Sequence, residues 1–327
     1  MIQRVFKNLG LYDGEAPPES AQLERDGWAK LSAVFATDAV DAMKAEIEAA
    51  FVAFSSERSR GDKDEFRYEM FNRSAACQRA IADPRILAVV EPLLGDDCHV
   101  IANTAWKNPP DFKGGPWHCD AGPHVPRAEG VEWPDEIPYP IFAIATHIML
   151  ADCSRADGPT AVVPGSHRSG RLAPVDLMRI DDLAYDGRPP QLFEVAAGDV
   201  VLFVSDVWHR GTPAAEGEGR GRFFLQAHYA RRDIAQRVRA TAQANQCSEE
   251  AIARAATPRE RAHRSSRPVL LRRLTHRGRR RHRGGAFRSL VRHPLQTSRQ
   301  TQYQGFTARR GGPSRRPPAG QAVPSTR

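Results

Sequence analysis

A histidine and an aspartate stand two positions apart in the stretch GPWHCDAG, residues 115–122, as His118 and Asp120. Imidazole nitrogens and carboxylate oxygens are both common ligands of metal ions. In an extended segment, side chains two positions apart point to the same side, so this pair can reach one ion while Cys119 points away and packs elsewhere. With 11 histidines in the chain, such a pair arises by chance often enough that its interpretation depends on its surroundings.

The best candidate for a third ligand is His209, in GDVVLFVSDVWHRGTPA, residues 198–214. It follows the end of an apolar strand, a position suited to the mouth of a barrel. Two histidines and one carboxylate on one side of an ion leave its other coordination positions open, which is the arrangement that holds non-haem Fe(II) for oxygen chemistry. The sequence therefore predicts an Fe(II) site at His118, Asp120 and His209, with places for O2 and a cosubstrate.

An arginine opens the strand RFFLQAHYA shortly after His209. Because an unpaired buried guanidinium is costly, Arg222 needs an anionic partner, and its planar fork fits a carboxylate. The far carboxylate of 2-oxoglutarate, a keto acid that chelates iron by its other end, would serve. Arg220 in the same GRGR run is the alternative, and Arg222 is favoured because it stands nearer the apolar strand.

The predicted elements place these residues around a β-structure supported by helices. Residues 19–55 are expected to be mainly helical, with Thr37 or Asp38 as an N-cap, and residues 82–95 form a second helix. Residues 233–257 are expected to be helical again and to pack outside the strands. No internal repeat is evident.

From about residue 98 the pattern changes to short β-rich segments bounded by Gly, Pro or Asp, which predicts a sandwich or barrel. The predicted strands cover residues 98–107, 140–150, 159–164, 191–195, 198–204 and 222–230. The segment 123–140 between the first two is longer than a hairpin needs, so it is either a surface loop or an active-site lid.

Four further histidines are not expected to bind metal. His147 and His228 fall inside apolar strands and are interpreted as core residues. His167, in PGSHRSG, is expected to bond within its own turn. His124, just after the His118 motif, is a candidate for lining the entrance of the site.

The charge of the chain divides at about residue 260. The segment from Arg261 to Arg327 contains 18 of the 47 basic residues and none of the 39 acidic ones, so the remainder carries 29 basic and 39 acidic side chains, a net charge of −10. We therefore predict a catalytic domain over residues 1–257 and an arginine-rich, disordered tail over 258–327. The tail has the composition of an out-of-frame reading of GC-rich DNA. The alternatives are a solubilising tail and a nucleic-acid-binding one.

Composition also limits the compartment. The longest apolar runs, such as VVLFV, are far too short for a membrane span, and the first residues show no apolar core of a secretory signal. Five scattered cysteines without a C-x-x-C pair favour reduced thiols. We expect a cytoplasmic protein, not bound to membranes.

Four motifs in this order resemble the phytanoyl-CoA dioxygenase family of Fe(II)/2-oxoglutarate-dependent oxygenases. They are PWHCDAG, LADCSRADGPTAVVPGSHRSG, GDVVLFVSDVWHRGTP and RFFLQAHY, and the opening RDGWAKLSAVFATDAVDAMKAEIE is also similar. The resemblance covers about residues 19–231. It implies a double-stranded β-helix, that is, a jelly-roll, cupin-like core that is mainly β with flanking helices.

The resemblance also implies roles for the site residues. Iron would be held by His118, Asp120 and His209, and 2-oxoglutarate by Arg222. Lys107 matches a position where members often carry a lysine that helps to bind the cosubstrate. Thr212 stands three residues after His209, where many members have a serine two residues after, and is assigned to the cosubstrate as well.

The function predicted from the sequence is an Fe(II)- and 2-oxoglutarate-dependent dioxygenase that uses O2 to hydroxylate a C–H bond of a small metabolite, with release of succinate and CO2. Hydroxylation is favoured because Asp120 is present, whereas the related halogenases lack this carboxylate; desaturation and cyclisation, which could use the same intermediate, stay open. One alternative is a cupin-like metalloenzyme that does not use 2-oxoglutarate. The other is a nucleic-acid-binding protein that acts through the basic tail. The sequence names neither a substrate nor an oligomeric state.

Overall fold

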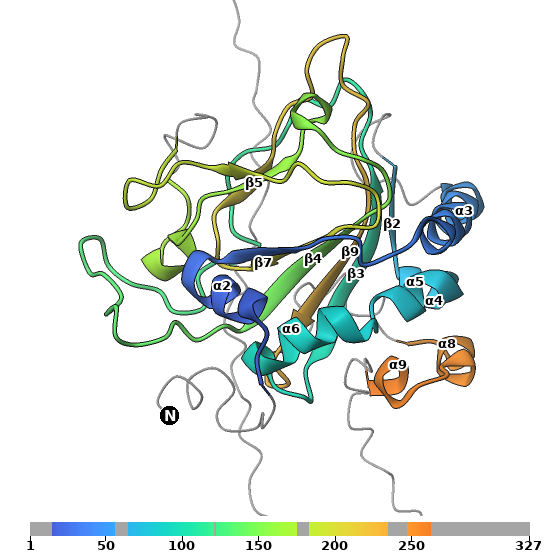
Figure 1. Ribbon diagram of the computed structural model, residues 1–327, viewed down its shortest axis with the longest axis horizontal. Coiled ribbons are helices and arrows are strands. Elements are labelled where there is room, and N and C mark those ends of the chain that lie inside the picture. The colour runs from blue at the N-terminus through green and yellow to red at the C-terminus, as the bar shows by residue number, and fades with distance from the viewer. Residues whose placement is uncertain (1–14, 56–64, 121, 175–182, 235–246, 263–327) are drawn as a thin grey trace, which may run out of the picture. The chain divides into compact units, whose positions relative to one another are not determined.

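The computed structural model describes residues 15–55, 65–120, 122–174, 183–234 and 247–262. Strands and short helices alternate along them (Figure 1). The strands are β1 (Trp28–Leu31), β2 (Glu65–Tyr68), β3 (His99–Lys107), β4 (Ala143–Met149), β5 (Thr160–Val162), β6 (Gln191–Leu192), β7 (Val200–Val204), β8 (His209–Gly211) and β9 (Phe223–Ala230). The helices are α2 (Pro18–Asp26), α3 (Thr37–Ala53), α4 (Met70–Arg73), α5 (Ala75–Ala80), α6 (Pro84–Leu94), α8 (Glu249–Arg254) and α9 (Pro258–Ala262), with 3₁₀ turns η2 (Arg155–Asp157) and η3 (Ser166–Ser169).

Two antiparallel sheets form the core. The large sheet has the strand order β1-β7-β4-β9-β3-β2, and the small sheet has the order β6-β5-β8. In Figure 1 the small sheet lies opposite β7, β4 and β9. The bridge between His118 and His209 connects the segment before β4 to the small sheet. This arrangement is the predicted jelly roll, mainly β with flanking helices.

Alternation along the strands of the large sheet gives each face its own function. In β9, Leu225, Ala227 and Tyr229 are buried against the helices, whereas Phe224 and Gln226 line a cavity between the sheets. The same alternation separates outward from inward residues in β3, β4 and β7, as the period of two requires. The sheet therefore supplies a hydrophobic core on its outer face and a functional surface on its inner face.

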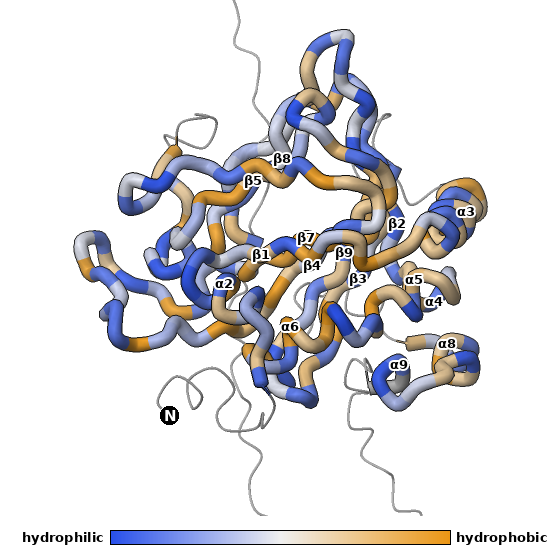
Figure 2. The backbone as a smooth tube through the Cα atoms, viewed as in Figure 1, coloured by the Kyte–Doolittle hydropathy of each residue, from blue (hydrophilic) through white to orange (hydrophobic). Residues whose placement is uncertain are grey.

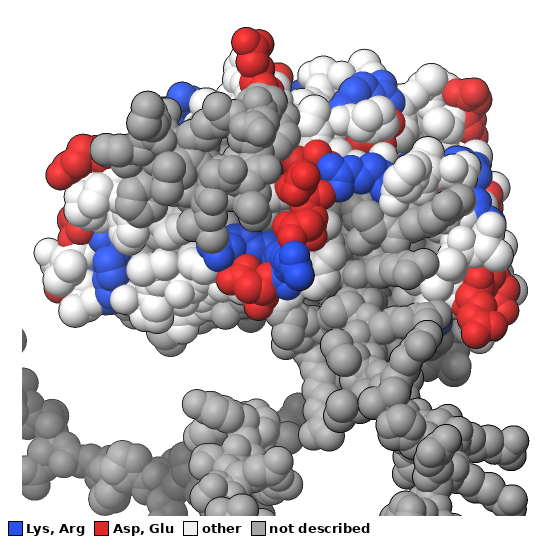
Figure 3. Space-filling view, turned by 90° about the horizontal axis from the view of Figure 1, so that it is seen from below, with Lys and Arg blue, Asp and Glu red and all other residues white. Residues whose placement is uncertain are grey.

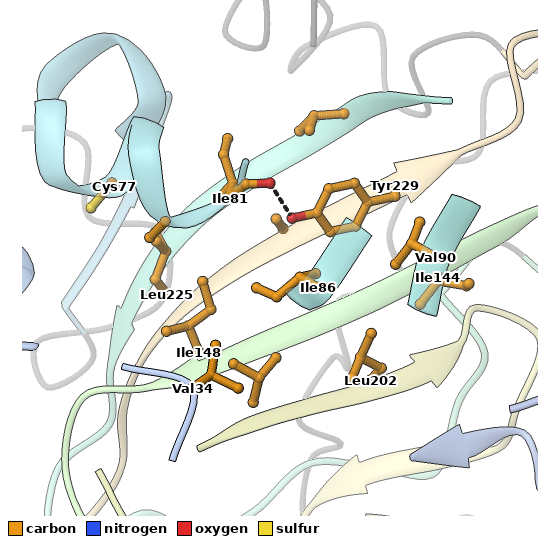
Figure 4. Packing of buried hydrophobic residues seen from close by; sticks show 14 of the residues in the cluster. Val34, Cys77, Ile81, Ile86, Val90, Ile144, Ile148, Leu202, Leu225 and Tyr229 are labelled. Carbon is orange, nitrogen blue, oxygen red and sulfur yellow. Dashed lines mark hydrogen bonds between the residues drawn. The ribbon is translucent and has the colours of Figure 1, made fainter. Parts of the chain in front are cut away.

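The helices α2, α3, α5 and α6 cover the outer face of the large sheet (Figure 1). Figure 4 shows this packing: Ile86 and Val90 of α6 lie against Ile144 and Tyr229, and the Tyr229 hydroxyl donates to the Ile81 carbonyl at 2.6 Å. The tube in Figure 2 is hydrophobic along much of the strands and mostly hydrophilic in the projecting loops. Burial of this face is what fixes the sheet.

Most predicted elements are confirmed, and three details differ. Residues 19–55 are not helical throughout, because β1 interrupts them and pairs with β7. The N-cap of α3 is Ala36, without a side-chain cap, and Asp38 instead accepts from the Ala39 amide. The short strands β2 and β8 and the short helices α4 and α5 were not predicted.

The C-terminal part of the described chain consists of α8 and α9. All described residues belong to one compact unit, Met1–Arg273. Of the helix predicted within 233–257, residues 235–246 lie outside the described residues, and α8 occupies the end. Helix α9 lies just past the predicted boundary at 257, and residues 263–327 lie outside the description, so the tail stays a prediction.

The described helices and surface bear on two other expectations. No described helix combines the length and the apolar character that crossing a membrane requires. On the face shown in Figure 3, acidic and basic side chains of the described residues occur in small interspersed groups. Among the described residues on that face there is no broad basic patch of the kind that attracts nucleic acid.

Candidate metal centre

The structure brings the three predicted ligands together. One ligand atom each from His118, Asp120 and His209 lies within 4.8 Å of the others. Nε2 of His209 is 3.4 Å from Oδ1 of Asp120, and the two imidazole rings are 4.3 Å apart at their centroids. Cys119 is not part of this group, as predicted from the alternation. The donor set of two nitrogens and one oxygen, on one side of a shared point, fits a non-haem iron site.

Backbone carbonyls set the orientation of both imidazoles. Nδ1 of His118 lies 3.0 Å from the Pro116 carbonyl, and Nδ1 of His209 lies 2.9 Å from the Val207 carbonyl. Because a carbonyl only accepts, both Nδ1 atoms carry the proton, and both Nε2 atoms keep a lone pair for a metal. Such outer hydrogen bonds are the usual support of metal-binding histidines.

The peptide backbone holds the ligands in register. His118 and His209 exchange both of their N–H···O bonds, at 3.0 and 2.9 Å, and the Asp120 amide donates to the Ser205 carbonyl at 3.1 Å. Residues 91 positions apart in the sequence are thereby fixed side by side, His209 at the start of β8 and His118 in an isolated bridge to it. The segment that carries His118 and Asp120 is thus held by backbone hydrogen bonds to β8 and to the turn after β7, which suits precise positioning.

Arg222 lines the same cavity as the triad, a space of about 510 Å³ between the two sheets. Its side chain is 7% exposed. Nε donates to Oδ1 of Asn108 at 3.1 Å, and Nη1 donates to the Thr160 hydroxyl at 2.7 Å. These bonds fix the direction of the guanidinium before any ligand arrives. Gly221, at φ +79°, allows the close approach of this segment to the backbone of Asn108.

Arg220, the rival of Arg222, lies elsewhere. Its side chain is 65% exposed, and its guanidinium and amide bind the Asp157 carboxylate at 2.8 to 3.2 Å. This guanidinium is the main reason that the pKa of Asp157 lies well below its usual range. Because Arg220 serves the turn before β5 and does not line the cavity, Arg222 is the arginine that the site can use.

A polar chain continues from Arg222 across the inner face. The Thr160 hydroxyl is 3.5 Å from Nδ1 of His147, whose Nε2 is 3.4 Å from the Gln226 amide nitrogen. The other end of the Gln226 amide is also bonded, because its Oε1 accepts from Nε1 of Trp106 at 2.9 Å. Burial, followed by the Arg222 charge, holds the pKa of His147 well below its usual value. His147 is thus a neutral, hydrogen-bonded residue, as predicted, but it also lines the cavity.

Lys107 does not reach the site. As the last residue of β3 it points to the outer face, where its Nζ binds Glu48 of α3 at 2.9 Å, while the preceding Trp106 lines the cavity. The alternation of β3 is the physical reason for the difference from the expectation. The next residue, Asn108, turns inward and bonds Arg222 instead.

Thr212 also lies apart from the described lining of the cavity. Its hydroxyl donates to the Pro159 carbonyl at 2.7 Å, and its amide donates to the same oxygen at 2.9 Å. Thr212 therefore connects the end of β8 to the turn before β5. In this position it supports Thr160, the residue directly after Pro159, rather than facing a cosubstrate.

Two other histidines differ from expectation. His167 bonds the Glu24 carbonyl of α2 through Nε2 at 3.0 Å, not its own turn, and burial lowers its pKa to about 4. His124 binds the buried Asp206 carboxylate and is not among the cavity-lining residues. The described part of the segment 122–140 contributes no lining residue to this cavity either, so its lid interpretation has no support.

Sequence reasoning missed Asn108, Thr160 and Gln226. Gln226 had a signal, because residues 224, 226 and 228 share the face of Arg222 in any extended strand. His228 is on that face too, with Nδ1 3.9 Å from Oδ2 of Asp120. Thr160 had no local signal, since its contact with Arg222 depends on how two sheets face each other.

Comparisons with known proteins agree with this geometry. The profile of the family described as "Phytanoyl-CoA dioxygenase (PhyH)" matches residues 23–220. The ectoine dioxygenase of Bordetella parapertussis is 30% identical over 157 residues, 44% of this chain and 47% of that protein. The ectoine dioxygenase of Sphingopyxis alaskensis is 28% identical over 160 residues, 46% and 49% of the two chains. These matches span about half the length of the curated relatives.

Solved structures show the same fold. The epimerase SnoN, in complex with Fe3+, alpha ketoglutarate and nogalamycin RO, matches with a TM-score of 0.53 at 19% identity, covering 74% of this chain and 91% of SnoN. EctD from S. alaskensis in its apoform matches with a TM-score of 0.52 at 22% identity, covering 67% and 79%. With the family profile matched over more than half of the sequence, the chain belongs to the phytanoyl-CoA dioxygenase family.

Proposed function

We propose that the protein is an Fe(II)- and 2-oxoglutarate-dependent dioxygenase that hydroxylates a small molecule. The observation that carries the proposal is the position of three ligand atoms, from His118, Asp120 and His209, within 4.8 Å of one another. They lie in the same cavity as the pre-oriented guanidinium of Arg222. A metal triad and an anion anchor in one space are what a chelating dicarboxylate requires.

Iron bound to this triad would supply the activation of O2 that organic side chains cannot perform. The overall reaction is balanced: 2-oxoglutarate, O2 and a substrate C–H yield succinate, CO2 and the alcohol. The His118 and His209 imidazoles and the Asp120 carboxylate would hold the metal on one side, leaving the other side to the reactants.

The remaining residues position the cosubstrate. Thr160, which bonds Arg222, pairs with Gly211 in the small sheet, two positions after His209. Two residues along a strand span about 7 Å, a separation that suits a short dicarboxylate chelated to the metal at one end. Asn108 and Thr160 keep the guanidinium directed into the cavity, so little ordering is left for binding. Arg222 would bind the far carboxylate in bidentate fashion.

The substrate would occupy the part of the cavity lined by the edge of the large sheet. Phe66 and Tyr68 of β2 and Trp106 of β3 form an aromatic wall there, with Phe66 4.2 Å from Trp106 and 4.5 Å from Tyr68 at the ring centroids. A cavity of about 510 Å³ lies in the range of small-molecule sites. The relatives are named for a small molecule, ectoine. The cavity size and these names together support a small metabolite as substrate.

The test is succinate formation from 2-oxoglutarate by the Fe(II)-loaded protein in air, measured across a panel of small metabolites. Arg222→Ala should raise the KM for 2-oxoglutarate by about a hundredfold, because a charge-assisted bidentate pair is lost. Arg220→Ala is the matched control and should stay within about twofold. Normal turnover by Arg222→Ala would contradict the proposal and favour a metalloenzyme that does not use 2-oxoglutarate.

A further inference from the structure

The turn that follows β7, residues 205–207, holds two of the three metal-site residues through its backbone carbonyls. The Ser205 carbonyl accepts the Asp120 amide at 3.1 Å, and the Val207 carbonyl accepts Nδ1–H of His209 at 2.9 Å. A shift of this turn would therefore move the carboxylate and one imidazole at the same time. Whatever fixes the turn also fixes the donor geometry.

The middle residue of the turn, Asp206, is itself fixed by three hydrogen bonds. Its side chain is 2% exposed. Oδ2 accepts from the His124 amide at 2.9 Å and from the Tyr139 hydroxyl at 2.8 Å, and Oδ1 accepts from Nδ1 of His124 at 2.5 Å. The Asp206 carbonyl in turn accepts from the thiol of Cys119, between the first two ligands, at 3.3 Å.

The donors to Asp206 come from outside the cavity. His124 and Tyr139 lie near the two ends of the segment 122–140. The Asp206 carboxylate therefore connects both ends of this segment by hydrogen bonds. The ring of His124 also stacks on Phe142 at 5.0 Å, and Tyr139 packs edge-on against the buried His167 at 5.3 Å. Both donors are thus held by packing as well as by hydrogen bonds.

We propose that Asp206 is a positioning residue of the metal site, and that His124 and Tyr139 transmit the placement of the segment 122–140 to the metal ligands through it. The inference rests on the proposed function, because it assumes that the triad binds a metal. Burial, followed by the Asp206 charge, holds the pKa of Tyr139 above its usual range. The phenol therefore stays a donor at any pH at which the protein is assayed.

The experiment measures Mn(II) binding to the metal-free full-length protein without 2-oxoglutarate, so it does not depend on turnover. Loss of an outer-shell partner typically weakens metal binding by about 10- to 100-fold. Asp206→Asn keeps the shape of the side chain but replaces one acceptor oxygen by a donor, and we expect this loss. Tyr139→Phe removes one of three donors and should weaken Mn(II) binding by about three- to tenfold.

Tyr185→Phe is the matched control. The Tyr185 hydroxyl donates to Glu132 at 2.8 Å, so this variant also loses one phenol-to-carboxylate bond on the same segment. That hydroxyl bond does not involve the 205–207 turn, and phenylalanine keeps the packing of the Tyr185 ring against Trp208, so Mn(II) affinity should stay within about twofold. The control separates positioning of the ligands from a general loosening of the segment 122–140.

The outcomes separate this inference from the proposed function. If wild type does not bind Mn(II), or binds it equally after His118→Ala, the proposed function fails and the inference falls with it. If wild type binds and His118→Ala does not, but Tyr139→Phe and Asp206→Asn bind like Tyr185→Phe, only the positioning role is wrong. Should Asp206→Asn fail to fold, Tyr139→Phe against Tyr185→Phe decides alone.

Discussion

At the scale of single residues, Gly211 controls the space of the proposed cosubstrate anchor. A Cβ at this position would stand 2.6 Å from Nη2 of Arg222 and 3.0 Å from the ring of Phe112. The guanidinium is the far end of a flexible side chain, so it would move rather than the backbone. Moving it would break its alignment by Asn108 and Thr160.

We therefore expect Gly211→Ala to raise the KM for 2-oxoglutarate by about tenfold, the equivalent of one lost hydrogen bond of about 1.4 kcal/mol. Mn(II) affinity should stay within about twofold, because the triad is untouched. Steady-state kinetics with varied 2-oxoglutarate measure the effect. An unchanged KM would show that the direction of the guanidinium does not matter for the cosubstrate.

Lys107 provides a test that separates the structure from the family resemblance. Its side chain pairs with Glu48 on the outer face, and exposed pairs of this kind contribute less than about 1 kcal/mol. Lys107→Ala should leave the KM for 2-oxoglutarate within about twofold and stability nearly unchanged. A tenfold rise in that KM would instead assign Lys107 to the cosubstrate site.

At the scale of elements, His167 connects η3 to α2. Its Nε2–H donates to the Glu24 carbonyl, and burial is the main reason that its pKa falls to about 4 from 6.5. In the folded protein the His167 imidazole thus stays neutral down to about pH 4, whereas in the unfolded chain it takes up a proton below pH 6.5. The contribution to stability is complete above pH 6.5 and decreases as the pH falls toward 4.

The expected loss is about 3 kcal/mol between these pH values, since each pKa unit corresponds to about 1.4 kcal/mol. His167→Gln keeps a donor for the Glu24 carbonyl but does not titrate in this range. Urea unfolding from pH 7 to 4 should show a steeper loss of the free energy of unfolding in wild type than in this variant. Parallel profiles would mean that His167 is not the group responsible.

The elements also show where prediction from sequence succeeds and where it ends. Long segments with a clear period, such as α3, α6, β3 and β9, were predicted nearly to their ends. The triad was predictable because strong ligand types stood at strand ends in a recognisable order. The roles of Asn108 and Thr160 were not predictable. They depend on how the large and small sheets lie against each other and on the register between β5 and β8. The position of Lys107 on the outer face follows from the alternation of β3, and its assignment to the cosubstrate stays a prediction.

At the scale of the whole molecule, the acidic body, residues 1–260, and the arginine-rich segment 261–327 have opposite net charge. The body contains every proposed site residue, and residues 263–327 contain none. A chain that ends at residue 262 should therefore keep its metal affinity and its KM for 2-oxoglutarate within about twofold. Its retention on heparin or nonspecific DNA should fall, because phosphate and sulfate groups bind arginine.

The same truncation tests the nucleic-acid alternative. If turnover disappears with residues 263–327 while the shortened protein remains folded by circular dichroism, the catalytic domain extends beyond the predicted boundary. If full-length protein binds DNA and His118→Ala has no effect on any measured activity, the alternative that places function in the basic segment gains the advantage.

The central claim is that one cavity holds a metal on His118, Asp120 and His209 and 2-oxoglutarate on Arg222 at the same time. Calorimetric titration of 2-oxoglutarate into the protein under nitrogen, with and without Mn(II), tests it most directly, because two ligands in contact must be thermodynamically coupled. We predict that Mn(II) tightens 2-oxoglutarate binding at least tenfold in wild type and not in Asp120→Ala. Equal affinity for 2-oxoglutarate with and without Mn(II) in wild type would contradict the account.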